Sequence, residues 1–215
     1  MPKMQMTTRA LVLCDDLWHP AVIARRGLKA LGGFGFDFEW LENGDRLSPA
    51  RMKEFPVIIL DKSNVMSAKD KRAWLTKDLL HALCKHIRRG NGLVVVHSGT
   101  AGYAELPVMR SMIGGTFVHH PPQCGVTVEP KRRQPLTIGV APFTVEDEHY
   151  FVKLDDAQAE VFLLARSEYG VQPAGWTRAE GKGRVCVLTP GHSLKVWLHP
   201  SFQALLLNAL RWAAT

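Results

Sequence analysis

The strongest constraint on the fold is a run of four apolar residues, Leu93 to Val96, three of which are β-branched. The sequence GNG precedes this run at 90–92, and the polar sequence HSG ends it at 97–99. A strand without polar alternation suits a position buried on both faces, which is typical of parallel sheets. Because such sheets bind ligands outside the carboxyl ends of their strands, we expect His97 and Ser98 at a functional edge.

The segments before this run alternate between strand and helix patterns. Strands are expected at 9–14, 36–41 and 57–60, and helices at 20–31, from residue 48, and after Ser67–Asp70, which resembles a capping arrangement. The last of these helices carries apolar residues at helical spacing, namely Trp74, Leu75, Leu79, Leu83 and Ile87. The order β-α-β-α-β-α-β implies right-handed crossovers and a doubly wound, flavodoxin-like, mostly parallel sheet of the α/β class.

The second half of the chain is less regular and predicts added antiparallel strands. Strand patterns occur at 125–129, 160–165, 175–177 and 184–188, and a hairpin turn is expected at 180–183. A short helix is expected at 109–115, and an amphipathic helix at 200–213 closes the chain. A length of 215 residues suits one α/β domain, and no repeat or low-complexity linker divides it, so we assign residues 1–215 to a single domain.

Charge and hydropathy are those of an ordinary globular protein. Hydrophobic residues make up 46% and charged residues 22% of the sequence, and no apolar stretch is long enough to span a bilayer. The net charge of +7 would suit an anionic partner, but the basic residues form short separate groups at 69–72, 88–89 and 131–133 without a nucleic-acid motif. We therefore expect a solvated basic surface rather than nucleic-acid or membrane binding.

The four cysteines, at positions 14, 84, 124 and 186, are scattered and form no CxxC pair. This pattern argues against a disulfide framework or a zinc ribbon. Residues 1–9 lack the apolar core of a signal peptide, so both features point to the reducing cytoplasm. The sequence leaves the oligomeric state open, a homo-oligomer included.

Three of the nine histidines follow predicted strands, and this placement defines the candidate site. His19 follows the first strand, His97 the central strand and His192 the last strand. Since parallel strands end at one edge of the sheet, we expect these imidazoles to converge there; the alternative is that each is merely hydrogen-bonded to backbone. Histidines 119, 120 and 149 lie in loops, those at 81 and 86 are expected to be surface or groove residues of a helix, and the one at 199 is expected to cap the last helix.

Two chemistries fit these residues, and the sequence does not separate them. In the first, the three strand-end histidines hold a divalent metal such as zinc with a carboxylate from Glu148, behind which stand Asp147 or Asp15. In the second, histidines with pKa values near neutrality move protons with Glu148 as partner acid or base. The catalytic candidates are His97, Glu148 and His192 in either case.

The candidate substrate-binding residues surround the histidine positions, and several carry rings of the kind that pack against sugars. They are Trp18, His19, Ser98, Tyr103, His120 and Tyr150.

Five segments resemble the ThuA, or trehalose-utilisation, family. They are LVVVHSGTAGY at 93–103, GGTFVHHP at 114–121, EDEHY at 146–150, GKGRVCVLTPGH at 181–192 and LLLNALRWA at 205–213. That family is similar in fold to the class I glutamine amidotransferases, whose nucleophilic cysteine sits on a sharp strand-to-helix turn with a glycine two residues later. Gly99 follows His97 at that interval, so His97 resembles the residue at the cysteine position.

The resemblance implies a role in the catabolism of trehalose or related disaccharides, beside a dehydrogenase that makes 3-keto sugars. No cysteine stands at the turn, so glutaminase activity is expected to be absent, and Ser98 lacks the flanking glycines of a GxSxG elbow. We expect a cytoplasmic protein that binds a small-molecule sugar and transforms it as a metal-assisted or His/Glu acid–base hydrolase or isomerase. The alternatives are a non-catalytic binding or interaction module and, third, a regulatory DNA-associated protein.

Overall fold

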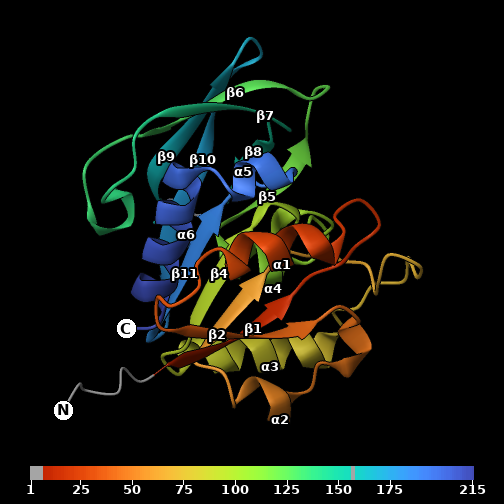
Figure 1. Cartoon of the computed structure of the whole chain (residues 1–215). Helices are drawn as coiled ribbons and strands as arrows, with labels where there is room; N and C mark the ends of the chain where they lie inside the picture. Colours follow the sequence, from red (N-terminus) through yellow and green to blue (C-terminus); the bar gives the residue numbers. More distant parts are fainter. Residues whose placement is uncertain (1–6, 156–157) are drawn as a thin grey trace, which may run out of the picture.

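The apolar run forms strand β4 (Gly92–Val96) within a nine-stranded sheet (Figure 1). The computed structural model describes residues 7–155 and 158–215. In spatial order the strands of this sheet are β2 (Phe36–Leu41), β1 (Thr8–Leu13), β3 (Val57–Leu60), β4, β11 (Gly183–Leu188), β10 (Gly170–Glu180), β9 (Glu160–Ser167), β6 (Cys124–Pro130) and β7 (Phe143–Asp147).

The sheet changes character at β11. From β2 to β11 every neighbouring pair of strands is parallel, whereas β10, β9, β6 and β7 continue the sheet in antiparallel pairs. The order β2-β1-β3-β4 is that of flavodoxin-like sheets, in which the chain reverses its direction of winding between β1 and β3. The expected α/β fold, with a doubly wound parallel sheet and added antiparallel strands, is therefore confirmed.

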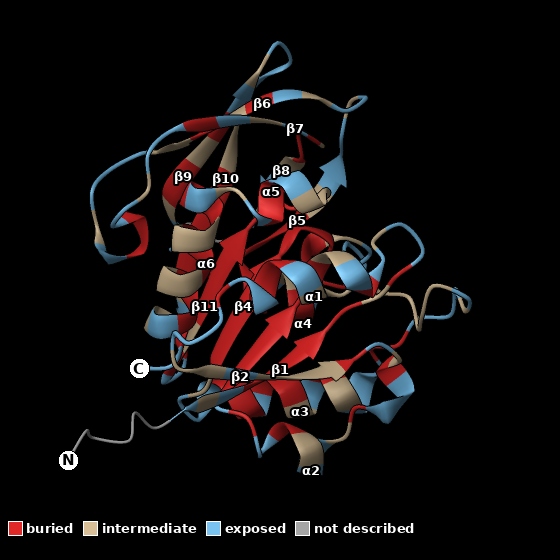
Figure 2. Ribbon diagram, viewed as in Figure 1, coloured by how far each residue is buried: buried red, intermediate tan, exposed pale blue. Residues whose placement is uncertain are grey.

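Helices cover both faces of the parallel half, and the strands between them are buried (Figure 2). One face packs against α1 (Ala21–Lys29), α5 (Leu194–Trp197) and α6 (Pro200–Ala213), and the other against α2 (Pro49–Met52), α3 (Lys77–Arg88) and α4 (Pro107–Ile113). Strand β1 shows the cause, because Ala10 and Val12 point to the first face and Leu11 and Leu13 to the second. Period-two alternation of apolar residues thus supplies both cores.

The expected start and cap of helix α3 were wrong. The helix begins at Lys77 and is capped by Thr76, whose side chain accepts a hydrogen bond from the Leu79 amide. Ser67 and Asp70 instead exchange backbone hydrogen bonds in an isolated bridge, because the Asp70 carboxylate is taken up by Arg72. His86 is largely buried, with its Nε2 3.0 Å from the Phe55 carbonyl oxygen, and it lines a hollow together with His81, in agreement with the groove position expected of it.

The closing helix matches its expected bounds, and His199 caps it as expected. Strands β5 (Gly115–His119), β7 and β8 (Phe151–Leu154) had no strand pattern assigned to them; β5 and β8 form a separate antiparallel pair. Within the described part of the chain, no helix combines the length and the apolar character that crossing a membrane requires.

Candidate functional site

The three strand-end histidines meet at the carboxyl edge of the parallel sheet. Ring centroids are 4.9 Å apart for His19 and His97, 5.3 Å for His19 and His192, and 5.7 Å for His97 and His192. The segments that carry them follow β1, β4 and β11, of which β1 adjoins the point where the winding reverses. The convergence expected from the chain direction of parallel strands is confirmed.

Asp16 fixes the position of His19. Its Oδ1 accepts hydrogen bonds from the amides of Trp18 and His19, both at 2.9 Å, and lies 2.8 Å from His19 Nδ1, while its Oδ2 accepts from the Ser63 amide at 2.9 Å. Burial alone would raise the pKa of Asp16, but the hydrogen bond and charge of His19 outweigh it, so the pKa lies well below its usual range. The same contact raises the pKa of His19 despite burial. Asp16 is therefore an ionised anchor for one imidazole.

His97 directly follows β4 and is the first residue of a 3-10 turn at His97–Thr100. Its φ is +41°, and Asp15 and His97 are the non-glycine residues with positive φ in the described ranges. Such backbone is uncommon and is found at functional sites when the surroundings enforce it. Here they do: His97 Nδ1 lies 2.7 Å from the Thr189 carbonyl oxygen, the ring stacks on Tyr150 at 4.1 Å, and a Cβ on Gly99 would lie 2.1 Å from the Leu60 carbonyl oxygen.

His192 is held by the antiparallel half of the sheet. Asp147, at the end of β7, accepts hydrogen bonds from the amides of Gly191 and His192, both at 3.0 Å. The Trp197 indole donates to the Gly191 carbonyl oxygen at 2.7 Å. Gly191 itself has a φ of +147°, and a Cβ there would come within 3.0 Å of His97 Cβ. Only glycine lets this loop lie so close to the turn at His97.

Glu148, immediately after β7, supplies a carboxylate to the histidines. Its Oε1 lies 3.1 Å from His192 Nδ1 and 3.6 Å from His120 Nε2, and its Oε2 lies 3.3 Å from His97 Nε2. Burial would raise the pKa of Glu148, but the facing imidazoles of His192 and His97 outweigh it and hold the pKa well below its usual range. For His97 burial prevails and lowers the pKa. Glu148 is thus an ionised carboxylate facing imidazoles.

The arrangement has the donor set of a metal centre. One ligand atom from each of four residues lies within 4.8 Å of the others, from His19, His97, Glu148 and His192. Three buried imidazole nitrogens, His19 Nε2, His97 Nε2 and His192 Nδ1, have no hydrogen-bond partner. Buried polar atoms are nearly always satisfied, so an exception of this kind at one place calls for an explanation.

A pocket of about 430 Å³ opens beside this cluster, within the size range of small-molecule sites. Trp18, 60% exposed, lies at its wall, and Phe117 and Tyr150 contribute further aromatic surface. Its lining residues are Trp18, His19, Ser63, Ala101, Phe117, His120, Gln123, Glu148, Tyr150 and His192. The pocket therefore joins a largely apolar aromatic wall to a few convergent polar groups.

Six of the nine catalytic and substrate-binding candidates line this pocket, whereas His97, Ser98 and Tyr103 are fully buried and do not. Ser98 is fully buried and donates to Asp61 Oδ1 at 3.3 Å, and Tyr103 is fully buried and donates to the Lys62 carbonyl oxygen at 2.8 Å. Asp15 accepts from the amides of Ala21 and Ala68, which makes it a structural residue. His149 turns away, with its Nδ1 2.5 Å from Ser167 Oγ.

Three residues near the site were not predicted from the sequence. Asp16 lies in a turn, and an aspartate that bonds to nearby backbone amides is common in turns, so its sequence context did not mark it as the partner of His19. Asp61, whose pKa burial raises to about 7, and Lys62, whose Nζ donates to the Glu42 carbonyl oxygen at 3.0 Å, follow β3. Their position at a strand end was the available signal.

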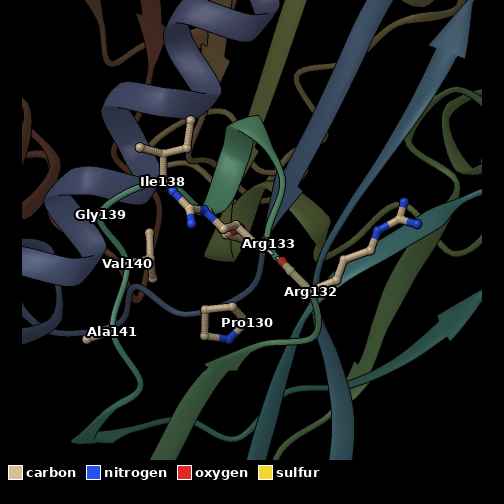
Figure 3. Close-up of a pocket in the computed structure, with 8 residues that line it drawn as sticks. Pro130, Arg132, Arg133, Ile138, Gly139, Val140 and Ala141 are labelled. Atoms are coloured by element: carbon tan, nitrogen blue, oxygen red, sulfur yellow. Dashed lines mark hydrogen bonds between the residues drawn. The ribbon is translucent and has the colours of Figure 1, made fainter.

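A second hollow of about 510 Å³ is lined by residues of the 130–141 segment beside α6 (Figure 3). Arg132 and Arg133 line it, but their guanidinium groups point in different directions (Figure 3). Arg132 is already paired with Glu160 at 3.1 Å. Its lining contains no histidine or carboxylate.

Fold and site together define an α/β protein with a histidine- and glutamate-lined pocket at the carboxyl edge of its parallel strands. The family model for ThuA, described as trehalose utilisation, matches residues 14–213, and the chain belongs to this family. No curated protein matches it.

Solved structures share the fold over nearly the whole chain. A ThuA-like protein of Bacteroides uniformis ATCC 8492 is 20% identical with a TM-score of 0.78, covering 99% of this chain and 94% of its own. A ThuA-like protein of Parabacteroides merdae ATCC 43184 is 15% identical with a TM-score of 0.75, covering 97% and 90%. A protein of Salmonella typhimurium LT2, described as cytoplasmic, is 12% identical with a TM-score of 0.71, covering 96% and 99%. At these identities the likeness concerns the fold alone.

Proposed function

We propose that this chain binds a sugar derivative from trehalose or a related disaccharide in the 430 Å³ pocket and transforms it by proton transfer, as a hydrolase or an isomerase. Membership of the trehalose-utilisation family supports the substrate class. The convergence of Glu148 with the imidazoles beside an open pocket is the observation that carries the proposal. An open pocket also favours this function over a binding fold whose site is filled by its own side chains.

The aromatic wall supports the binding step. Sugar rings present apolar C–H faces that pack against aromatic side chains, and a largely exposed tryptophan beside a pocket offers such a face. Trp18 has this position, in a pocket that Glu148 and His120 also line. Ring stacking contributes about 0.5–1.5 kcal/mol, so we expect Trp18→Ala to weaken sugar binding about tenfold or less.

The polar groups support the chemical step. An imidazole beside the ionised Glu148 is able to take a proton from a hydroxyl group, or from a carbon beside a keto group, and to return it elsewhere on the sugar, while the carboxylate stabilises the imidazolium that forms. His120 is the partly exposed imidazole on the pocket side of Glu148, with its Nδ1 2.7 Å from the Pro121 carbonyl oxygen. Removal of a proton from carbon leads to isomerisation, and activation of water leads to hydrolysis.

The test uses trehalose and its 3-keto derivative with the purified protein in deuterated water. Proton NMR follows deuterium uptake at the carbon beside the keto group, new isomers and released monosaccharide in one experiment. We expect one of these signals with the native protein and its loss in Glu148→Gln, with His119→Gln as the matched control, because His119 is exposed and stacks on Phe151 outside the pocket. Equal rates for Glu148→Gln and the native protein would contradict the proposal.

The proposal places the chain in the cytoplasm. The scattered cysteines, all free in the structure, suit a reducing compartment, and the Salmonella protein of the same fold is described as cytoplasmic. Fractionation of cells that produce the untagged chain tests this, and recovery outside the cytoplasm would contradict it.

A further inference from the structure

We propose that the histidine–glutamate cluster binds one divalent transition-metal ion, with zinc as the best-fitting metal. The ligand atoms would be His19 Nε2, His97 Nε2, His192 Nδ1 and a carboxylate oxygen of Glu148. The inference deepens the proposed function and rests on it for what the ion does to a sugar. Metal binding itself is measured without any sugar.

The hydrogen bonds behind two histidines favour metal binding. His97 Nδ1 faces the Thr189 carbonyl oxygen at 2.7 Å, and a carbonyl oxygen only accepts, so the proton belongs on Nδ1. His19 Nδ1 faces the Asp16 carboxylate at 2.8 Å in the same way. A partner of this kind on the far ring nitrogen is the usual support of a metal-bound histidine, because it fixes the tautomer and aims the lone pair of Nε2 at the ion.

The contact between His97 and Glu148 gives the strongest argument. With Nδ1 facing the Thr189 carbonyl oxygen, His97 Nε2 faces Glu148 Oε2, 3.3 Å away, and the two atoms do not have hydrogen-bond geometry. Two acceptors that face one another in a buried place repel unless a cation lies between them. A metal ion removes this conflict and satisfies the three unpartnered nitrogens at once.

The spacing of the ligand atoms is close to what an ion needs. Zinc–nitrogen bonds of about 2.0–2.1 Å place tetrahedral ligands roughly 3.4 Å apart. The approaches of Glu148 to His97 and His192, at 3.3 Å and 3.1 Å, already have this value, and the widest separation in the cluster is 4.8 Å. Metal binding would bring the remaining ligand atoms closer, and His192 and Glu148 lie outside the helices and strands.

The donor types select the class of metal. Three imidazoles and one carboxylate suit zinc and its transition-metal neighbours, whereas calcium and magnesium prefer oxygen ligands. No cysteine belongs to the cluster, so a thiolate-rich structural zinc site is excluded for these residues. Because His19, Glu148 and His192 also line the open pocket, an ion there would have a free side for water or a sugar oxygen.

The experiment measures metal in the full-length, untagged protein. Protein purified from zinc-supplemented cells is analysed for metal content, then stripped with a chelator and titrated with zinc against a chromophoric competitor. We expect about one zinc per chain in the native protein and its loss in His97→Ala and in His192→Ala. The second variant changes a partly exposed side chain, so folding, checked by circular dichroism, is preserved there if not in the first.

Two further variants separate a positioned centre from adventitious binding. Asp16→Asn keeps the four ligands but replaces the carboxylate behind His19, and we expect a 10–100-fold weaker zinc affinity. His81→Gln, on the exposed side of α3, is the matched control and is expected to bind zinc as the native protein does.

The outcomes distinguish the two proposals. No stoichiometric zinc in the native protein after titration, or equal zinc in His97→Ala, His192→Ala and the native protein, would overturn the metal site whatever the sugar assay shows. Stoichiometric zinc that these variants lose, without any change to trehalose or its keto derivative, would sustain the metal site and reject the proposed function. Cobalt substitution adds a spectroscopic readout, since its visible absorption reports coordination directly.

Discussion

Replacement of Asp147 by alanine tests how the antiparallel strands hold the loop that carries His192. Asp147 is 1% exposed, and its two oxygens accept hydrogen bonds from the Gly191 and His192 amides at 3.0 Å each. In Asp147→Ala both backbone N–H groups lose their acceptor, and each unsatisfied buried donor costs about 1–3 kcal/mol of stability. Burial raises the pKa of Asp147, so removing the carboxyl also relieves a desolvation cost. We expect a net loss of about 2–4 kcal/mol.

Urea denaturation, followed by tryptophan fluorescence and extrapolated to water, measures this loss. In a chain of this size each kcal/mol shifts Tm by about 2–4 °C, so thermal unfolding should begin roughly 4–16 °C lower. Glu146→Ala is the matched control, because Glu146 is an exposed neighbour on β7, and it should stay within about 0.5 kcal/mol of the native protein. An equally small effect of Asp147→Ala would refute the reasoning.

Three more predictions concern packing and titration. Gly99→Ala places a Cβ 2.1 Å from the backbone oxygen of Leu60, so we expect about 1–3 kcal/mol of destabilisation in the same urea assay, and unchanged stability would contradict this. In a thiol-reagent assay at pH 8 we expect one fast cysteine, Cys124, because the other three are buried and burial raises their pKa; a second fast thiol would show the packing to be wrong. Burial lowers the pKa of His86 below its ordinary 6.5, so the unfolded chain takes up the proton first and stability is lost as pH falls below about 6.5. His86→Gln should flatten this loss, by at most about 1.4 kcal/mol per pH unit, and equal slopes would exclude the effect.

The sequence predicted the parts of the site that chain direction controls. His19, His97 and His192 converge because parallel strands end at one edge, and the apolar runs before them identify those strands. Side-chain direction within the turns was beyond that reasoning. Ser98 is adjacent to His97, yet the 3-10 turn points it to Asp61 in the core.

The carboxylates show the same limit. Glu148 was a candidate because of its residue type, while its contact with three imidazoles depends on how β7 pairs with β6, at the far end of the sheet from β1. That pairing lies between segments with weak strand patterns. Asp16 received no role because a buried carboxylate that supports its own loop has the same composition signal as an ordinary turn.

The location of Glu148 has a consequence for the energetics of the whole molecule. This side chain comes from the end of the antiparallel section, whereas the imidazoles of His19, His97 and His192 follow strands of the parallel section. Any ligand that binds both Glu148 and these imidazoles links segments of the chain from residue 19 to residue 192, so that these segments unfold together. At a ligand concentration of about one hundred times its Kd, binding would add about 2.7 kcal/mol to the free energy of unfolding. This stabilisation would extend to residues that do not contact the ligand.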